Sequence, residues 1–169
     1  MSKRSTDGIA ISIKLKRRMI SIISDEECEG KDEGKNCTNA EFAKRVGVSL
    51  NVITNMTAHG IIPSTRSLIK IADYTNKPFD YILGISDDTD FEKSENPVTF
   101  DVRLLELIQE NNLRFSDITN SPDITFCRNS IHLWIKRKNL PYYHYVLQLA
   151  KFFHVSTDYL LGRTDYKHN

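Results

Sequence analysis

The sequence predicts an all-α protein made of two tandem domains of about five short helices each, and three observations lead to this prediction. Segment 49–84 matches segment 127–162 without a gap, at a constant offset of 78 positions. Apolar residues recur at helical spacing, and no convincing alternating strand pattern is present. A length of 169 residues suits two small domains better than one large domain. Because a repeat this long is a whole supersecondary module, the functional question is what one module does and why two are joined.

The distribution of charged residues along the chain also indicates two domains joined by a linker. We predict a first domain over 1–84, an acidic linker over 85–97 and a second domain over 98–169, with formal charges of +3, −4 and +2. An acidic loop over 24–37 carries −4, which leaves +7 on the rest of the first domain. Both domains are therefore basic, although the whole chain carries only +1. Solvated helix faces would account for these charges equally well.

The first helix is predicted from its apolar spacing. Isoleucines fall near one face between Ile9 and Ile23, with basic residues elsewhere, as in an amphipathic helix. Segment 25–36 lacks apolar residues and is predicted to be a loop. The positions assigned to the apolar face are Ile9, Ile13, Met19 or Ile20, and Ile23.

The second helix of the first domain has clear start and stop signals. Thr38 followed by Glu41 predicts a capping box for a helix over 39–46. Gly47 ends that helix because glycine readily adopts the left-handed conformation. Ser49 is predicted to cap the next helix.

The remaining elements follow from core spacing. Ile53 and Met56 form the core side of the third helix, as Ile131 and Trp134 do in the second domain. In the rest of the first domain, Pro63 closes a loop, Leu68, Ile71 and Ala72 mark a fourth helix, and 79–83 form a short fifth.

Segment 38–49, with the Asp-Tyr-Ile-Leu-Gly run at 80–84, resembles the phage-repressor helix-turn-helix family, also called Cro and lambda-repressor-like, or XRE. In that family the second helix begins with a threonine and an amide, an alanine packs inside the turn, and a glycine makes the turn. The first domain keeps all of these features. The second departs from them, with Thr119 in place of the alanine, Thr125 in place of the glycine, and about two extra residues within 120–123.

The resemblance implies which side chains would read DNA. In the family the third helix enters the major groove, and its first two turns face base edges. Arginine can bind guanine O6 and N7 with two donors, asparagine can pair with adenine, and leucine can touch a thymine methyl. The base-reading candidates are Leu50, Asn51, Thr54 and Asn55 in the first domain, and Arg128, Asn129, Ser130, His132 and Leu133 in the second.

Phosphate contacts are expected from the start of the second helix and from the loop after the third. The loop at 59–62 of the first domain is unusually apolar for this role, so each domain departs from the family in a different place. The sequence therefore leaves open which domain binds DNA more tightly, or whether both bind. The phosphate candidates are Thr38, Asn39, Ser116, Lys136, Arg137 and Lys138.

The function implied is that of a sequence-specific regulator of transcription, a phage or mobile-element repressor, with double-stranded DNA as its partner. Its expected location is the cytoplasm, with the nucleoid when bound. An alternative is a protein-interaction regulator of the antitoxin or antirepressor type, in which one domain or neither binds DNA; exposure of Ile61 and Ile62 would favour it, whereas folding against the fourth helix would not. A third alternative is homodimerisation through the first domain.

Other classes of function have little support. The sequence has no phosphate-binding glycine loop, metalloprotease motif or nucleophile elbow, so we predict no catalytic residues and no enzyme. No cofactor and no small-molecule ligand are evident. No apolar run reaches the roughly 18 residues of a membrane span.

Cysteines and aromatic residues leave smaller alternatives open. Cys28 and Cys37 could supply two ligands, but structural zinc needs four, so no metal site is predicted. Cys127 stands at the cap of the third helix of the second domain, where oxidation could disrupt DNA contact. An aromatic group near the fourth helix could stack on single strands, although packing is the better expectation. Its members are Tyr142, Tyr143, Tyr145, Phe152 and Phe153.

Overall fold

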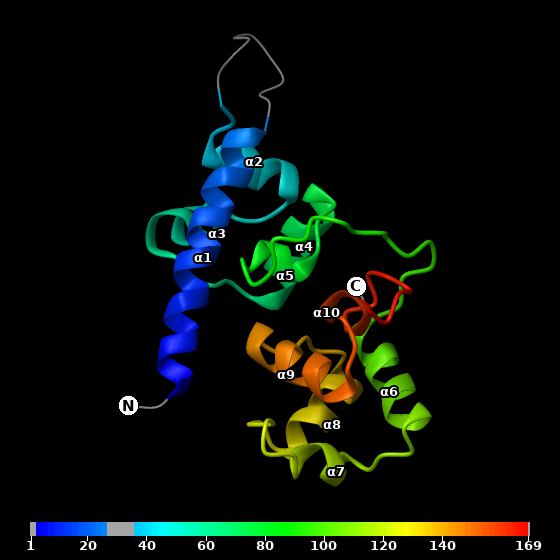
Figure 1. The fold of residues 1–169 in the computed structure, drawn as a ribbon. Helices are drawn as coiled ribbons and strands as arrows, with labels where there is room; N and C mark the ends of the chain where they lie inside the picture. The colour runs from blue at the N-terminus through cyan, green and yellow to red at the C-terminus, as the bar shows by residue number, and fades with distance from the viewer. Residues whose placement is uncertain (1–2, 27–35, 169) are drawn as a thin grey trace. The chain divides into compact units, whose positions relative to one another are not determined.

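A computed structural model describes residues 3–26 and 36–168 of the chain, with side chains described from residue 8 onward. Within those residues every regular element is helical and no strand occurs, so the predicted all-α fold is confirmed (Figure 1). The chain separates into two compact units, unit 1 at 1–90 and unit 2 at 91–169.

The elements of each unit follow one another as short helices. Unit 1 contains α1 (Lys3–Asp25), α2 (Asn39–Val46), α3 (Leu50–Thr54), the π-helix η1 (Asn55–His59), α4 (Thr65–Thr75) and α5 (Phe79–Ile82). Unit 2 contains α6 (Phe100–Glu110), α7 (Phe115–Thr119), α8 (Arg128–Arg137), α9 (Tyr143–Phe153) and α10 (Thr157–Leu160).

Helix bounds in the two units correspond at the offset found in the sequence. The combined span of α3 and η1 lies 78 positions before α8, α4 lies 78 before α9, and α5 lies 78 before α10. By contrast, α2 begins only 76 positions before α7, so the stretch from the start of α7 to the start of α8 is two residues longer than its counterpart in unit 1. Residues with positive φ at or just after the ends of these helices also pair at the offset of 78: Gly60 with Lys138, Asn76 with His154, and Gly84 with Gly162.

The first helix differs from its prediction in length and in buried face. It begins at Lys3, six residues before the predicted start at Ile9. Apolar residues occur almost all round α1, so spacing alone could not identify the face that packs. The close approach of Gly60 and Gly84 to the backbone of α1 decides it. The face that packs holds Leu15, Met19 and Ile23, whereas Ile9, Ile13 and Ile20 are exposed.

The start and end of α2 are as predicted. The Thr38 side chain accepts a hydrogen bond from the Glu41 N–H, and the Glu41 carboxylate accepts one from the Thr38 N–H at 2.9 Å. Gly47 follows the helix with a φ of 74°, in the left-handed region. Ser49 caps α3 by accepting from the N–H of Val52. These caps satisfy amides that would otherwise lack partners and fix where each helix begins.

The predicted core residues are buried. Ile53, Met56 and Ile131 are fully buried and Trp134 nearly so. In unit 2 the Trp134 ring packs edge-on against Phe126, with ring centroids 4.8 Å apart. Tyr145 joins them, 5.4 Å from Phe126. Tyr145 is half-buried, and its ring packs against the core of unit 2, as expected for an aromatic residue of the fourth helix.

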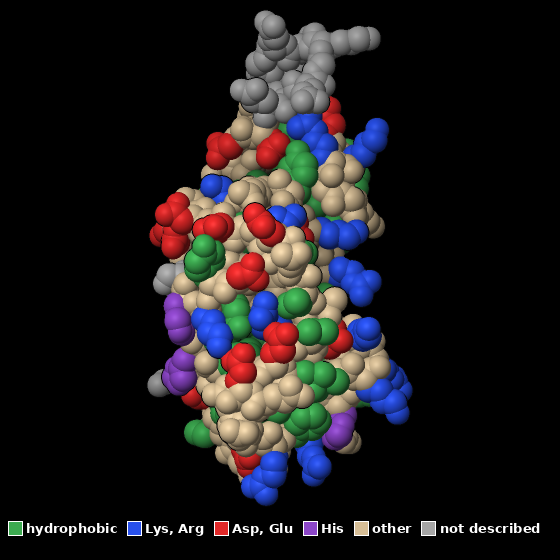
Figure 2. Space-filling view, turned by 90° about the vertical axis from the view of Figure 1, so that its right-hand side faces the viewer, with side chains coloured by type: hydrophobic (Ala, Val, Ile, Leu, Met, Phe, Trp, Pro, Cys, Tyr) green, Lys and Arg blue, Asp and Glu red, His purple; other side chains and the backbone are tan. Residues whose placement is uncertain are grey.

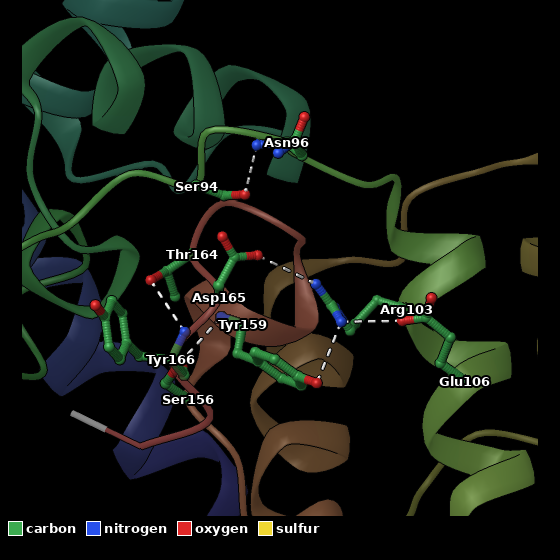
Figure 3. Close-up of polar contacts among 9 residues, drawn as sticks. All are labelled: Ser94, Asn96, Arg103, Glu106, Ser156, Tyr159, Thr164, Asp165 and Tyr166. Atoms are coloured by element: carbon green, nitrogen blue, oxygen red, sulfur yellow. Dashed lines mark hydrogen bonds and ion pairs between the residues drawn. The ribbon is translucent and has the colours of Figure 1, made fainter.

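In unit 2 an arginine joins the first helix to the last (Figure 3). The Arg103 guanidinium carbon lies 4.2 Å from the centre of the Tyr159 ring, and the group donates to the Tyr159 hydroxyl at 3.2 Å. It also donates to Glu106 at 2.9 Å and forms an ion pair with Asp165 at 3.9 Å. Arg103 therefore ties α6 to α10 and to the chain that follows it.

Unit 1 contains the corresponding arrangement. The Arg18 guanidinium carbon, on α1, lies 3.8 Å from the centre of the Tyr81 ring, and Arg18 also binds Asp87 at 2.5 Å. Tyr81 and Asp87 precede Tyr159 and Asp165 by 78 positions. The correspondence between the units thus extends to the tie between their first and last helices.

Part of the predicted linker packs within unit 2. Ser94 is buried, and its N–H donates to the Arg163 carbonyl at 2.8 Å. The Arg163 guanidinium lies over the Phe91 ring at 4.3 Å and forms a buried ion pair with Asp158. Residues 91–97 therefore belong to unit 2.

Candidate nucleic-acid interface

In unit 1 the predicted base-reading side chains lie on the exposed side of α3 and η1. The buried Ile53 and Met56 anchor the opposite side of this helix in the core. Since side chains three or four positions apart share a helix face, the intervening polar residues point outward together. The exposed candidates are Leu50, Asn51, Thr54 and Asn55.

The second half of this helix has a π-helical turn that the sequence does not signal. The N–H of Gly60 reaches the carbonyls of both Met56 and Asn55, and the N–H of Ile61 donates to the Asn55 carbonyl at 3.1 Å. Such turns are rare and often occur at functional sites. The matching helix α8 is α-helical throughout its ten residues.

In unit 2 four of the five base-reading candidates are exposed, and Ser130 is half-buried. The Ser130 hydroxyl lies 3.6 Å from the Cys127 sulfur. The His132 ring packs edge-on against Phe115 of α7, 4.8 Å between centroids, so α7 helps to orient it. The exposed candidates are Arg128, Asn129, His132 and Leu133.

The basic run, predicted to lie in the loop after the third helix, instead lies in the last turn of α8 and at its end, where it can meet an anion. Lys136, Arg137 and Lys138 are all exposed. Lys138 ends α8 in the left-handed conformation, with a φ of 53°. Three adjacent cations at one helix end form a local positive surface of the kind that contacts phosphates.

Candidates at the start of α2 are already engaged within the protein. The N–H and hydroxyl of Thr38 both donate to the Glu41 carboxylate. The Asn39 amide donates to the Thr57 hydroxyl at 3.1 Å, which links α2 to η1. A phosphate at this end would therefore meet the carboxylate of Glu41 together with the helix amides.

At the corresponding position in unit 2, Ser116 is half-buried on α7. The Asp117 carboxylate accepts from the Arg114 N–H at 2.8 Å and from its guanidinium at 3.0 Å. These hydrogen bonds from Arg114 lower the pKa of Asp117 below its ordinary value. An anion approaching Ser116 would meet this ionised carboxylate.

A tie between the turn and the fourth helix is present in both units and was missed from the sequence. In unit 1 the Lys70 ammonium donates to the Gly47 carbonyl at 2.7 Å. In unit 2 the Gln148 side chain accepts from the Thr125 N–H at 3.0 Å and donates to its hydroxyl at 2.9 Å. Both partners pair at the offset of 78, which is the signal that could have found this tie.

The apolar loop after η1 rests on α1. The Ser12 hydroxyl donates to the Gly60 carbonyl at 2.6 Å, and Lys16 donates to the Ala58 carbonyl at 2.7 Å. Gly60 is buried and Ile62 is half-buried, whereas Ile61 is 52% exposed. The loop thus both packs inward and presents one large apolar side chain.

The cysteines have contrasting environments. Cys127 is exposed, and hydrogen bonds from Ser130 lower the pKa of its thiol. Cys37 is buried beside α2, and Cys28 lies outside the described residues. In the described part of the chain, no group of three or more histidine, cysteine or carboxylate side chains could hold a metal ion.

Acidic and basic side chains both appear on the face drawn in Figure 2, so the chain does not present one uniform charge. None of the described helices combines the length and the apolar character that crossing a bilayer requires.

Comparison with known proteins gives a family-model match over the segment that runs from α2 to α5. No curated protein and no solved structure matches the chain. Residues 33–82, which lie in unit 1, match the family model described as Helix-turn-helix.

Proposed function

We propose that this protein is a sequence-specific double-stranded DNA-binding regulator of transcription, of the phage or mobile-element repressor kind, with a reading helix in each unit. The observation that supports this most strongly is the exposed polar row on α3 and η1, next to a capped α2 and a left-handed glycine turn. A helix held in this way can enter a major groove with its first turns toward base edges.

The correspondence of helix bounds supports the extension of this role to unit 2. There α8 exposes Arg128 and Asn129 in its first turn and carries the basic run 136–138 at its end. Arginine and asparagine are the side chains best suited to paired contacts with guanine and adenine. The basic run supplies the sequence-independent part of the affinity.

The two reading helices differ in sequence, and this predicts an asymmetric target. Leu50 stands where unit 2 has Arg128, and Val52 where it has Ser130, although Asn51 and Asn129 are identical. A covalent pair of unlike units selects two unlike half-sites, whereas a symmetric dimer selects a palindrome. Binding by one unit raises the effective concentration of the other at the neighbouring half-site.

Selection of duplexes from a random pool tests this function. The full chain is compared with Asn51→Ala plus Asn55→Ala, and with Arg128→Ala plus Asn129→Ala. An asymmetric consensus that loses one half with each double variant is expected, and the exposed Asn96→Ala serves as a control that leaves it intact. Absence of any enriched sequence would rule out sequence-specific binding.

A second candidate function is favoured by Ile61. This side chain is 52% exposed at the end of η1, where a DNA-binding loop would ordinarily be polar. In this alternative unit 1 binds a protein partner, such as an antirepressor or a second copy of the chain, and only unit 2 binds DNA. Enrichment insensitive to Asn51→Ala plus Asn55→Ala would support it, and a palindromic site with a dimeric mass would identify the second copy as that partner.

A further inference from the structure

The third helices of the two units differ in the charge that they carry at their ends. In unit 2 the basic run 136–138 occupies the last turn of α8 and the residue after it. At the offset of 78, the corresponding residues of unit 1 are Ala58, His59 and Gly60. The end of η1 therefore lacks the lysines and the arginine with which unit 2 can contact a phosphate.

In unit 1 the first helix brings a cation to this position. The Lys16 ammonium donates to the Ala58 carbonyl at 2.7 Å, and Ala58 is the residue that corresponds to Lys136. One turn earlier on α1, the Ser12 hydroxyl donates to the Gly60 carbonyl at 2.6 Å. These two hydrogen bonds hold α1 against the end of η1 and fix the position of the Lys16 ammonium there.

The first helices of the two units can be aligned through the arginine that stacks on a tyrosine in each. Arg18 and Arg103 are 85 positions apart, and at this offset buried core residues of α1 also pair with buried core residues of α6. Lys16 then pairs with Asp101, which is buried. Unit 1 thus has a cation on its first helix where unit 2 has a carboxylate, and the reverse difference occurs at the end of the third helix. The buried pairs are Leu15 with Phe100, Met19 with Leu104, and Ile23 with Ile108.

The Lys16 ammonium can bind an anion in addition to the Ala58 carbonyl. An ammonium has three N–H donors, and the carbonyl accepts from one of them. Within the described part of the chain, no carboxylate forms an ion pair with Lys16. Lys16 is half-buried, and the neighbouring Ala58 and His59 are exposed, so an anion can approach this end of η1 from solvent.

We infer that Lys16 supplies the phosphate contact of unit 1 that the basic run supplies in unit 2, an assignment that rests on the proposed DNA-binding function. Contacts to phosphates position a protein on the duplex so that other side chains can read the bases. The candidates expected from the sequence, Thr38 and Asn39, are already hydrogen-bonded within unit 1. Lys16 was not among them because it precedes Ala58 by 42 positions, and only the fold brings the two together.

The salt dependence of DNA binding by the full chain tests this assignment. Each phosphate contact that is lost reduces the slope of log affinity against log salt concentration by about one. Lys16→Ala should therefore weaken binding to specific and random duplexes alike, by about threefold or more at low salt, and reduce the slope by about one.

Lys14→Ala is the matched control for Lys16→Ala. Lys14 is an exposed lysine of the same helix, but its β-carbon lies beside Gly84 and not beside η1. This variant removes the same charge and should leave the salt slope unchanged. An equal reduction of the slope by the two variants would contradict the inference, because it would show a general effect of the charge of α1.

Two further variants separate a phosphate contact from a role in stabilising the end of η1. Lys16→Arg keeps the charge and should keep the slope. Ala58→Lys combined with Lys16→Ala places a lysine where unit 2 has Lys136, and it should restore the slope because Ala58 is exposed. If Lys16 only stabilises η1, Lys16→Ala will unfold at lower urea concentration with an unchanged salt slope, and that result would overturn the inference.

Lys138→Ala in unit 2 serves as the reference in the same titrations. A reduced slope for Lys138→Ala with an unchanged slope for Lys16→Ala would assign the phosphate contact to unit 2 and overturn the inference alone. A full chain that binds no duplex would overturn the proposed function, and this inference with it. Reduced slopes for both variants would support a phosphate contact in each unit.

Discussion

The third helices of the two units have the same length and different surroundings. Residues 50–59 and 128–137 each span ten positions, end in a left-handed residue, and pack an isoleucine fully into the core. Yet the first has a π-turn and an apolar loop resting on a helix of 23 residues, whereas the second is regular, ends in a basic run, and has a first helix of only 11 residues. Core positions thus fix the shared frame, and exposed positions are free to diverge.

The residue that ends each third helix shows how a shared backbone conformation can be occupied by different residues. Gly60 and Lys138 both have positive φ, at 65° and 53°. A β-carbon on Gly60 would lie 2.7 Å from the Ser12 hydroxyl, so unit 1 has no room for a side chain there. Lys138 is exposed and can carry a side chain into solvent. The same backbone conformation is therefore occupied by different residues because their neighbours differ.

The largest expected effect compares two glycines with nearly equal φ. Gly162→Ala in unit 2 brings a β-carbon against the backbone carbonyl of Val98, whereas Gly47→Ala in unit 1 meets nothing within 4 Å. We expect Gly47→Ala to cost about 1 kcal/mol of unfolding free energy from strain alone, and Gly162→Ala about 3 kcal/mol or more.

Urea unfolding measures both effects. Trp134, the single tryptophan, reports on unit 2 by fluorescence, and far-UV circular dichroism follows the whole chain. Equal losses in the two variants would show that crowding at Gly162 is relieved by movement of the segment that contains Val98.

The next prediction separates contacts to bases from contacts to phosphates in unit 2. Arg128→Ala should cost about 1–3 kcal/mol on the preferred sequence and relax the preference at one base pair. Lys138→Ala should weaken binding to all duplexes and reduce the salt slope by about one. Anisotropy titrations at several salt concentrations distinguish these effects, and equal loss on specific and random duplexes from Arg128→Ala would refute a base-reading role.

A smaller effect tests the tie between turn and fourth helix. Gln148 makes several hydrogen bonds to Thr125, and one of them satisfies a backbone N–H. Gln148→Ala should therefore cost about 1–2 kcal/mol of unfolding free energy. Lys70→Ala removes one exposed bond to Gly47 and should cost less than about 1 kcal/mol. Thermal unfolding measures the stability of both variants. A larger loss from Lys70→Ala than from Gln148→Ala would show that the Gly47 turn of unit 1 depends more on its contact with the fourth helix than the turn before α8 does.

The smallest effect concerns pH at the start of α7, where the carboxylate of Asp117 caps the helix beside Arg114. Hydrogen bonds from Arg114 lower the pKa of Asp117 in the folded state. Its contribution to stability is therefore present above the unfolded pKa of about 3.9 and is lost as the pH falls through the lower folded value. Carbon-13 titration of the Asp117 carboxyl should show that Arg114→Ala raises this pKa. An unchanged value would mean that the amides of α7, and not the arginine, set it.

The sequence predicted the parts of the site that depend on local chemistry. The Thr38 and Glu41 caps and the Gly47 turn are in place because each depends only on residues within one helical turn. Burial of Ile53 and Ile131 follows from helical spacing in the same way. Which candidates contact DNA stays a prediction.

Long-range contacts could not be predicted in this way. The prediction of the buried face of α1 was wrong for Ile9 and Ile13, and of the alternatives Met19 and Ile20 it is Met19 that is buried. Apolar residues occur on several sides of this helix, and the face that packs lies where Gly60 and Gly84 approach its backbone. The hydrogen bond from the Asn39 amide to the Thr57 hydroxyl joins residues 18 positions apart, and no periodic pattern in the sequence signals it.

By itself the sequence determined the helical class, the ends of α2 and the repeated frame at an offset of 78, since capping, glycine turns and apolar periodicity act over a few residues. Only the tertiary structure decided the π-turn and the ties of Arg18 and Arg103. These features arise where segments distant in the chain meet, and packing there depends on all the surfaces at once.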